Sequence, residues 1–291
     1  MSSMIPASLL EGYLRRIGLD HIDNPSLENL FTLQASHLDN LSYSNLDLLL
    51  GRPEGLEPLN CIRHIVEVGR SSGCCQHNGA FAAVLQSLGY KVRSLWGTVS
   101  SEPGKPGTPA GNHMAISVTV QGEDWLTDVG LGDAFRAPIR LQSAIVEQYP
   151  FRYELRQTTQ GSWLFRHDPR GSFAEVEILT RLVVPQDFAL QYTYYISDPE
   201  SPFLRTLAIH RRGHDFVSTL RGRTLRRIDK DGLHDSEVQS EEDLWSIIAE
   251  VFKITIDDVT PLERHQIWRR ISTHPSSKIE TPPEVDLGST Q

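Results

Sequence analysis

The fold is decided around RSSGCCQHNGAF, residues 70–81, where a short polar segment runs into an apolar helical pattern. Cys74 stands at this junction, so its thiol is predicted at the N-terminus of a helix that ends at Gly89, a typical C-terminal glycine. Unpaired N–H groups and the helix dipole stabilise a negative charge at such a position. Cys74 is therefore a candidate nucleophile. The alternative is a buried, inert thiol, which is the commoner state of cysteine.

Helical spacing also dominates the residues before Cys74. Apolar residues recur at this spacing over residues 9–17, 27–41 and 62–66, which predicts three further helices. Asn24 followed by Pro25 predicts the start of the second helix, because an asparagine cap and a first-turn proline both favour a helix N-terminus. The third helix is expected to stop near Gly69.

From Tyr90 onwards the apolar period changes towards two, which predicts strands. These strands cover residues 90–99, 113–120, 124–129, 151–157, 162–167, 174–183 and 187–195. The Gly/Pro-rich stretch 97–111 predicts a long loop, a kind of segment that often carries function. A hairpin at 216–228, with its turn at Arg221-Gly222, and a helix around 244–252 follow. The Ser/Pro-rich tail from about Ser272 is expected to be disordered.

Two of the predicted strands bring a histidine and a carboxylate together. A two-residue turn at 121–122 pairs Val120 with Glu123 across these strands. In this register Asp128 lies on the same face as His113, as a diagonal neighbour with the Cα atoms ~7–8 Å apart. A thiolate nucleophile needs a histidine to accept its proton and a third group to orient that histidine. An ordinary polar pair on a solvated sheet face is the alternative.

Composition and charge exclude several classes of protein. The 291 residues suggest roughly two domains at ~150 residues each. Hydrophobic residues make up 39% and charged residues 22%, which excludes a disordered chain, and no apolar run approaches the ~20 residues that cross a bilayer. The 28 Lys and Arg against 37 Asp and Glu give a net charge of −9, so nucleic acid is not an expected partner. Three cysteines without a secretory signal indicate a reducing, cytoplasmic location.

No metal site and no nucleotide site is predicted. Cys74, Cys75 and His77 are close in sequence, but a structural zinc site needs four ligands from spaced pairs. His210 and His214 lack the H-E-x-x-H context, and no G-x-x-x-x-G-K-[ST] loop is present. The expected partners are therefore small-molecule substrates.

Three stretches of the chain are similar to the motifs of one known family. They are RSSGCCQHNGAF (70–81), NHMAISV (112–118) and TDVGLGDAFRAPIRL (127–141). In this order and at this spacing they resemble the arylamine N-acetyltransferase family. The resemblance spans roughly residues 5–255.

Most residues of the family signature have a counterpart at the matching position of this chain. The family has an Arg-Gly-Gly-x-Cys stretch, followed by Glu or Gln two residues on and by Asn four residues on. Cys74, Gln76 and Asn78 fit this spacing. The family's second and third catalytic residues are a histidine that opens a strand and the aspartate of a D-x-G-x-G segment. His113 and Asp128 match these two.

The resemblance implies an α+β fold of the papain-like Cys-His-Asp transferase type in three parts. They are an N-terminal helical bundle with the cysteine (1–89), a central β-barrel with the histidine and aspartate (90–195), and a C-terminal α/β lid with the tail (196–291).

The resemblance also implies a ping-pong acyltransferase without a tightly bound cofactor. Cys74, as a thiolate, attacks an acyl thioester such as acetyl-CoA, and the acyl group then passes from the cysteine to an arylamine or a related amine. His113 holds the proton, and Asp128 fixes the imidazole tautomer. Backbone N–H groups near Cys74 stabilise the tetrahedral oxyanion.

Residues for the two substrates can also be suggested. Phe135 and Tyr43 are expected beside the aryl acceptor. Arg221, Arg223 and Arg226 belong to a basic cluster that is expected to flank the phosphates of CoA, since an acidic protein must gather local positive charge for them. A solvated basic hairpin is the alternative interpretation of this cluster.

The chain departs from the family pattern beside Cys74. Ser71-Ser72 stand where the family has two glycines, and Tyr43-Ser44-Asn45 where it often has Phe-Glu-Asn. A second function of the same triad therefore stays open, in a cyclase or release enzyme of secondary metabolism. Such an enzyme forms an intramolecular amide or a Dieckmann-type C–C bond on an acyl amino ester or carrier-bound thioester, without free CoA. A papain-like protease and a non-enzymatic protein with an inert Cys74 are alternatives of other classes.

Overall fold

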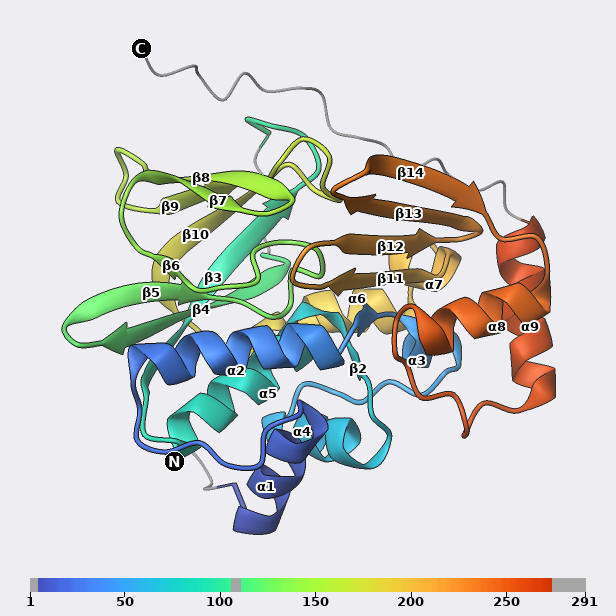
Figure 1. The fold of residues 1–291 in the computed structure, drawn as a ribbon, viewed down its shortest axis with the longest axis horizontal. Coiled ribbons are helices and arrows are strands. Elements are labelled where there is room, and N and C mark those ends of the chain that lie inside the picture. Colours follow the sequence, from blue (N-terminus) through green and yellow to red (C-terminus); the bar gives the residue numbers. More distant parts are fainter. Residues whose placement is uncertain (1–4, 106–110, 274–291) are drawn as a thin grey trace.

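The N-terminal part of the computed structural model is helical, as its apolar spacing predicts (Figure 1). The structure describes residues 5–105 and 111–273. The helices are α1 (Ala7–Arg16), α2 (Leu27–Asn40), α3 (Leu46–Leu49), α4 (Pro58–Glu67) and α5 (Gly73–Ser87). Helix α5 begins directly before Cys74, and it packs against α4 and against strands of the large sheet.

The start of α2 differs from the prediction. The helix begins after Ser26 rather than at the Asn24-Pro25 pair, so that prediction is wrong by two residues. The reason is the hydroxyl of Ser26, which accepts a hydrogen bond from the backbone N–H of Asn29 at 3.1 Å and so caps the helix.

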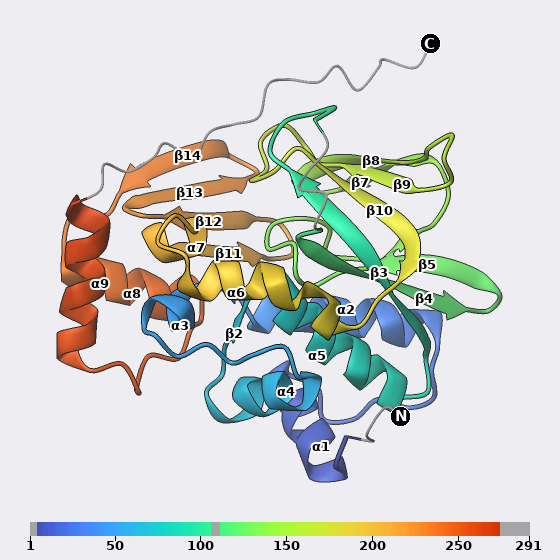
Figure 2. The ribbon, with the colours of Figure 1, turned by 180° about the vertical axis from the view of Figure 1, so that it is seen from behind.

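An eight-stranded antiparallel sheet follows the helices, in the order β6-β5-β4-β3-β10-β9-β8-β7. Its strands are β3 (Lys91–Ser100), β4 (His113–Val120), β5 (Glu123–Thr127), β6 (Ile139–Arg140), β7 (Ala144–Gln148), β8 (Phe151–Gln157), β9 (Trp163–Arg166) and β10 (Glu175–Leu182). The sheet curls into a nearly closed, barrel-like form (Figures 1 and 2). The predicted mixture of helices and strands is therefore confirmed.

The predicted loop at 97–111 is shorter than expected, because β3 continues to Ser100. Residues 106–110 of this loop, like the tail from 274 onwards, lie outside the described residues. The short strands β6 and β7 were not predicted from the sequence.

The strand predicted over residues 187–195 is wrong. A 3-10 turn (η1, Pro185–Phe188) leads instead into helix α6 (Ala189–Ser197). Pro185 begins the turn, and the carboxylate of Asp187 accepts a hydrogen bond from the N–H of Val184 at 2.8 Å. The aromatic residues of this segment favour a strand by propensity, but this local capping and the helical spacing of Phe188, Tyr192 and Tyr195 prevail. The expected division of the chain at residue 195 thus falls inside α6.

A second sheet joins the two ends of the chain, in the order β14-β13-β12-β11-β1-β2. Its strands are β1 (Tyr43–Ser44), β2 (Ser71–Ser72), β11 (Ala208–Arg212), β12 (Val217–Arg221), β13 (Thr224–Asp229) and β14 (Gly232–Glu237). Strand β1 pairs antiparallel with β11 and parallel with β2. The segment directly before Cys74 is therefore an edge strand of a sheet built mainly from the C-terminal part.

The C-terminal helices are α7 (Pro202–Arg205), α8 (Glu241–Glu250) and α9 (Pro261–Thr273). The predicted hairpin and the helix around 244–252 are confirmed. The turn of the hairpin is Gly222-Arg223, one residue later than predicted, because Arg221 pairs with Thr224. Strands β11 and β14 and helix α9 were not predicted.

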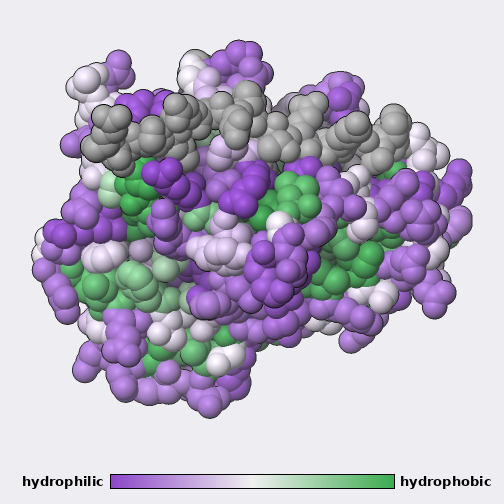
Figure 3. All heavy atoms as spheres, turned by 45° about the horizontal axis from the view of Figure 1, so that its top comes forward, coloured by the Kyte–Doolittle hydropathy of each residue, from purple (hydrophilic) through white to green (hydrophobic). Residues whose placement is uncertain are grey.

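The surface of the molecule is mainly polar. Figure 3 shows hydrophilic side chains over most of the face that it presents, with apolar side chains in separate patches between them. Within residues 5–105 and 111–273, none of the helices combines the length and the apolar character needed to cross a membrane.

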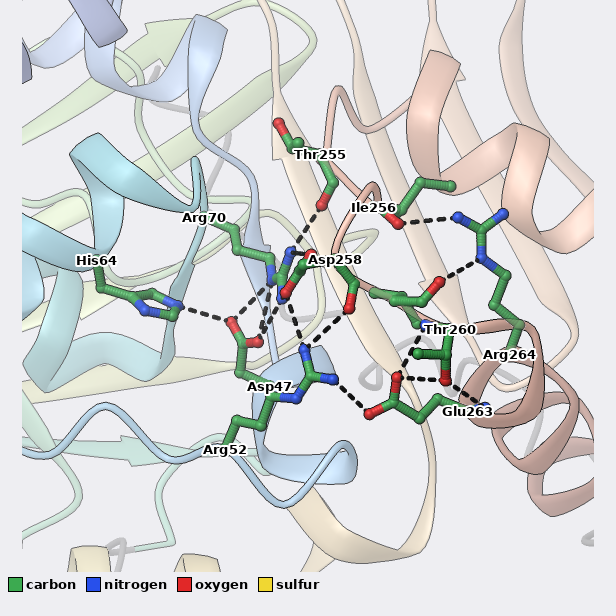
Figure 4. Close-up of polar contacts among 11 residues, drawn as sticks. Asp47, Arg52, His64, Arg70, Thr255, Ile256, Asp258, Thr260, Glu263 and Arg264 are labelled. Atoms are coloured by element: carbon green, nitrogen blue, oxygen red, sulfur yellow. Dashed lines mark hydrogen bonds and ion pairs between the residues drawn. The ribbon is translucent and has the colours of Figure 1, made fainter.

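A buried guanidinium ties the two ends of the chain together just before β2 (Figure 4). The side chain of Arg70 is 1% exposed. It donates to both carboxylate oxygens of Asp47 on α3 at 2.8–3.0 Å and to both oxygens of Asp258, between α8 and α9, at 2.7 Å. His64 on α4 shares Asp47, with Nε2 at 3.0 Å from Oδ2. The position of β2 is thus set by three elements at once.

The same network continues into the C-terminal helices (Figure 4). Arg52 contacts Asp258 at 2.9 Å and also pairs with Glu263 on α9. Glu263 in turn accepts from the backbone N–H and the hydroxyl of Thr260 at 2.8 Å. Charged groups therefore link the segment that leads into α9 to the N-terminal half, in addition to the apolar cluster that Ile254 and Val259 share with Leu46.

We predict that Arg70→Met lowers the free energy of unfolding by about 3 kcal/mol, because it leaves the buried carboxylate of Asp47 without its main partner. Urea denaturation measures this change. Arg63→Met, on the exposed face of the neighbouring helix α4, is the matched control and is expected to change the free energy by less than about 0.5 kcal/mol. Equal effects of the two substitutions would contradict the bracing role of Arg70.

Candidate active site

Cys74 lies in the first turn of α5, as the sequence predicts. The helix starts sharply because Gly73 adopts a φ of +73°, and a side chain there would also approach the Gln76 amide oxygen to 2.9 Å. Residue Cys74 is partly exposed, whereas residue Cys75 is buried. Of the two neighbouring cysteines, Cys74 is therefore the more accessible to a substrate.

The predicted register of β4 and β5 is confirmed, since Val120 pairs with Glu123. This register places His113 at the start of β4 close to Asp128, which directly follows β5. Their side chains are 1% exposed, and His113 Nε2 lies 2.7 Å from Asp128 Oδ2. Because Nε2 is occupied by the carboxylate, Nδ1 is the nitrogen left to contact sulfur.

The other oxygen of Asp128 is held by the helix that carries the cysteine. Asp128 Oδ1 accepts from the side-chain amide of Asn78 at 2.9 Å and from the N–H of Gly130 at 2.8 Å. Asn78 lies one turn after Cys74 on α5, and it also binds Met114 O and the N–H of Val129. The side-chain amide of Asn78 thus fixes α5 against β4 and the end of β5, and it orients the carboxylate of Asp128.

Gly130 explains why a glycine follows the aspartate in the D-x-G-x-G segment. A Cβ at this position would lie 2.7 Å from the carbonyl oxygen and 2.8 Å from the Cα of Cys74. No other residue leaves room for such a close approach of two backbones. The loop after β5 therefore packs directly against the residue that carries the thiol.

The thiol of Cys74 has three polar neighbours. The imidazole of His113 is close enough to lower the pKa of this thiol. Its sulfur also lies 3.3 Å from Asn112 O and 3.9 Å from the sulfur of Cys75. The structure therefore brings together Cys74, His113 and Asp128, the three residues that the sequence singled out.

Electrostatics in this cluster favour a thiolate. The pKa of Cys74 lies well below its usual value, because hydrogen bonds from the Cys75 thiol and from His113 outweigh the opposing effect of burial. Burial alone would lower the pKa of His113, but the charge of Asp128, its hydrogen bond and the neighbouring sulfur raise it to about 10. The hydrogen bond to the Cys74 sulfur, burial and the charge of the Cys74 thiolate raise the pKa of Cys75, so that thiol retains its proton. The arrangement favours a thiolate–imidazolium pair at neutral pH.

An aromatic hollow opens beside the sulfur. It has a volume of about 420 Å³, counted to its open mouth. The aromatic residues that line it are Tyr43, Phe188, Tyr192, Tyr195 and Phe203. Four of these were not among the predicted site residues, and three of the four, Phe188, Tyr192 and Tyr195, lie within residues 187–195, which were predicted as a strand. Helical spacing of the aromatic residues after Pro185 was the signal that could have identified them.

Phe135 does not reach this hollow. It is 1% exposed and packs in the barrel core, with its ring 5.3 Å from that of Phe165 and 6.4 Å from that of Tyr153. The expectation that it contacts an aryl acceptor is therefore not met, because the loop after Asp128 turns its side chain inward. Tyr43, the other residue suggested for that role, does line the hollow.

The three arginines suggested for CoA lie on the β12–β13 hairpin and do not line the hollow. Arg226 is 6% exposed and forms a bidentate pair with Asp235 on β14 at 2.8 and 2.9 Å. Arg223 pairs with Glu237 at 3.1 Å, and Arg221 is exposed at the end of β12. Carboxylates of the same sheet thus take up part of the positive charge, which agrees with the alternative of a solvated basic hairpin.

His77 points into a buried chain of polar groups. Its Nδ1 lies 3.0 Å from Nε2 of His37, whose Nδ1 lies 2.5 Å from the hydroxyl of Tyr13. Burial lowers the pKa of His77 to about 4, so it is neutral at physiological pH. In the part of the chain that the structure describes, no three His, Cys, Asp or Glu side chains are grouped so that they could hold a metal ion.

Comparison with known proteins gives a consistent family assignment. A family model described as N-acetyltransferase matches residues 26–260. The arylamine N-acetyltransferase of Mycolicibacterium smegmatis is 33% identical over 228 residues, which cover 74% of this chain and 81% of that protein. The proansamycin X synthase of Amycolatopsis mediterranei is 33% identical over 162 residues, covering 54% and 62%.

Comparison of the fold with solved structures indicates the same family. The structure of Mycobacterium marinum arylamine N-acetyltransferase in complex with CoA superposes with a TM-score of 0.80 at 28% identity, covering 90% of this chain and 98% of that one. Sequence and fold agree over most of the chain. This protein therefore belongs to the arylamine N-acetyltransferase family.

Proposed function

We propose that this protein is an acetyltransferase that moves an acetyl group from acetyl-CoA to an arylamine through a thioester on Cys74. The observation that carries the proposal is the hydrogen bond between His113 and Asp128, which leaves Nδ1 of the imidazole for the sulfur. This is the geometry that a papain-like nucleophile needs. The family relationship supports the substrate classes, because relatives are arylamine N-acetyltransferases and one was solved with CoA.

In the first half-reaction, the Cys74 thiolate attacks the carbonyl carbon of the thioester. The bond from carbon to the CoA sulfur breaks, a bond to Cys74 forms, and the proton on His113 passes to the leaving CoA thiolate. Unpaired backbone N–H groups at the start of α5 stabilise the oxyanion of the tetrahedral intermediate. Exchange of one thioester for another is nearly isoenergetic, which suits a cysteine to this step.

In the second half-reaction, the amine attacks the acetyl-cysteine. The new C–N bond forms, the bond to sulfur breaks, and His113 takes the proton that the amine nitrogen loses. Asp128 stabilises the imidazolium and keeps the tautomer that faces the sulfur. The cycle returns the thiolate–imidazolium pair, so no tightly bound cofactor is required.

The acceptor enters through the aromatic hollow. Tyr192 and Tyr195 of α6 and Tyr43 of β1 line this hollow, so an aryl ring that enters it stacks among them. Helix α6, which carries both tyrosines, has no fully buried residue and is the wall best able to move.

A second candidate function is the cyclase or release reaction on a tethered acyl chain. Similarity to proansamycin X synthase supports it, as does the pairing of two hairpin arginines with carboxylates of their own sheet. The same nucleophile, base and carboxylate serve both reactions. The two candidates differ in the donor, which is free CoA ester in one and an acyl amino ester or carrier-bound thioester in the other, and in the acceptor, which is a separate arylamine in the first and a group of the same tethered chain in the second.

We predict that Cys74→Ala abolishes acyl-enzyme formation and lowers turnover by about a thousandfold or more, because it removes the nucleophile. Cys75→Ala, the matched control at the neighbouring position, should still form the adduct. Intact-mass measurement after mixing each variant with acetyl-CoA tests this directly. An acetyl adduct that survives in Cys74→Ala and disappears in Cys75→Ala would show that Cys75 is the nucleophile instead.

A panel of acyl compounds tests which class of acyl donor the protein uses. Acetyl-CoA with an arylamine should give an acetyl adduct on the protein, free CoA and an acetylated amine. Mass spectrometry of protein and products measures all three. If no CoA ester acylates the protein while an acyl amino ester is turned over, the acetyltransferase proposal is wrong and the cyclase candidate replaces it.

A further inference from the structure

A carboxylate outside the proposed triad holds the segment that leads to Cys74. Glu54 lies on the loop between α3 and α4, and its side chain is 2% exposed. Its Oε1 accepts a hydrogen bond from the backbone N–H of Ser72 at 2.5 Å and another from the hydroxyl of Ser71 at 3.1 Å. Ser72 is the last residue before α5 and lies two positions before the nucleophile.

Strand β2 needs such a partner because it is the edge strand of its sheet. On one side β2 pairs with β1, with Ser72 opposite Ser44. On its other side β2 has no neighbouring strand in the sheet. Glu54 takes the place of such a strand and accepts the hydrogen bond from the N–H of Ser72. Glu54 thus adds a charge-assisted hydrogen bond, which is stronger than a neutral one, to the pairing with β1 that holds the peptide entering α5.

Gly55, the residue after Glu54, makes hydrogen bonds to both α5 and α6, which lie on two sides of the hollow. The carbonyl of Gly55 accepts from the side chain of Gln76, in the first turn of α5, at 2.9 Å. The N–H of Gly55 donates to the hydroxyl of Tyr192 on α6, also at 2.9 Å. Glu54 and Gly55 therefore join the strand before the cysteine, the helix that carries it and the aromatic wall opposite.

The second oxygen of Glu54 is what makes this contact sensitive to protonation. Oε2 is buried and has no hydrogen-bond partner among the residues that the structure describes, and it lies 4.0 Å from Nε2 of His64 on α4. Burial raises the pKa of Glu54 to about 7, although His64 and the N–H of Ser72 oppose the shift. Above this pH the carboxylate is charged. Below it Oε2 carries a proton, and Oε1 becomes a weaker acceptor.

The groups that face Glu54 come from three helices. His64 and Cys61 lie on α4, Asp47 on α3 and Tyr192 on α6. Burial opposes the charge of His64, but its hydrogen bond to Asp47 and the charge of Glu54 raise its pKa. Burial keeps Cys61 and Tyr192 protonated by raising both pKa values. His64 is thus the one cation among these four groups, and Asp47 binds it more closely than Glu54 does.

We propose that Glu54 is a positioning residue for Cys74. The carboxylate of Glu54 fixes the peptide before α5 and so holds the Cys74 thiol against His113. The inference rests on the proposed role of Cys74 as nucleophile. The reactivity of Cys74 then depends on the ionisation of Glu54 as well as on the ionisation of the three triad residues. The reactive geometry is complete when Glu54 is charged and loosens when Glu54 takes up a proton.

The test is the rate of alkylation of Cys74 by iodoacetamide as a function of pH, in the full chain. Wild-type protein should show a fall in rate as the pH drops through about 7, where Glu54 takes up its proton. Glu54→Gln keeps an acceptor oxygen but is neutral at every pH, so its rate should stay near the slower rate that wild type shows below about pH 7 and should lose this inflection. Glu54→Ala should be about tenfold slower at mildly alkaline pH.

Glu67→Ala is the matched control, because Glu67 is an exposed carboxylate at the end of α4. It should behave as wild type, and circular dichroism should show that every variant is folded. If Glu54→Ala does not fold, the pH profile of Glu54→Gln decides alone. A reactive wild-type cysteine with unchanged profiles in the Glu54 variants overturns this inference. A wild-type cysteine that reacts as slowly as a free thiol overturns the proposed function and the inference with it.

Discussion

The buried carboxylate of Asp128 is the constraint on which the rest of the site depends. A charge with 1% exposure is tolerated only when each of its oxygens is paired, and here Oδ2 binds His113 while Oδ1 binds Asn78 and the N–H of Gly130. Asn78 belongs to the helix of the nucleophile, and His113 begins a strand of the barrel-like sheet. Satisfying one carboxylate therefore fixes the helix against the sheet and places Cys74 beside the imidazole.

Support for this arrangement comes from parts of the chain far apart in sequence. Arg70 binds Asp47 and Asp258 just before β2, and Glu54 binds the next two residues. The strand that leads to the thiol is in addition part of a sheet whose other main strands come from residues 208–237. The C-terminal part thus acts as a brace for the nucleophile. The same contacts stabilise the folded chain and hold the residues of the site in their reactive geometry.

The sequence predicts the site better than its surroundings. The alternating pattern on both sides of the turn at 121–122 is enough to set the register of β4 and β5, and the register is enough to bring His113 to Asp128. The α6 segment was predicted wrongly, because the strand propensity of its aromatic residues was given more weight than their helical spacing and the cap at Pro185. Phe135 was misjudged because its burial depends on how the loop after Asp128 packs, which is a tertiary contact that no short pattern encodes.

The central claim is that Cys74 is a thiolate at neutral pH because a buried imidazolium lies beside it. Ultraviolet absorbance of the thiolate, measured against pH in wild-type protein and in Cys74→Ser, tests this most directly. The difference between the two should show an ionisation well below the ~8.5 of a free cysteine, with the pair persisting until His113 loses its proton at about pH 10. A Cys74 signal that appears only near the free-cysteine value would contradict the account.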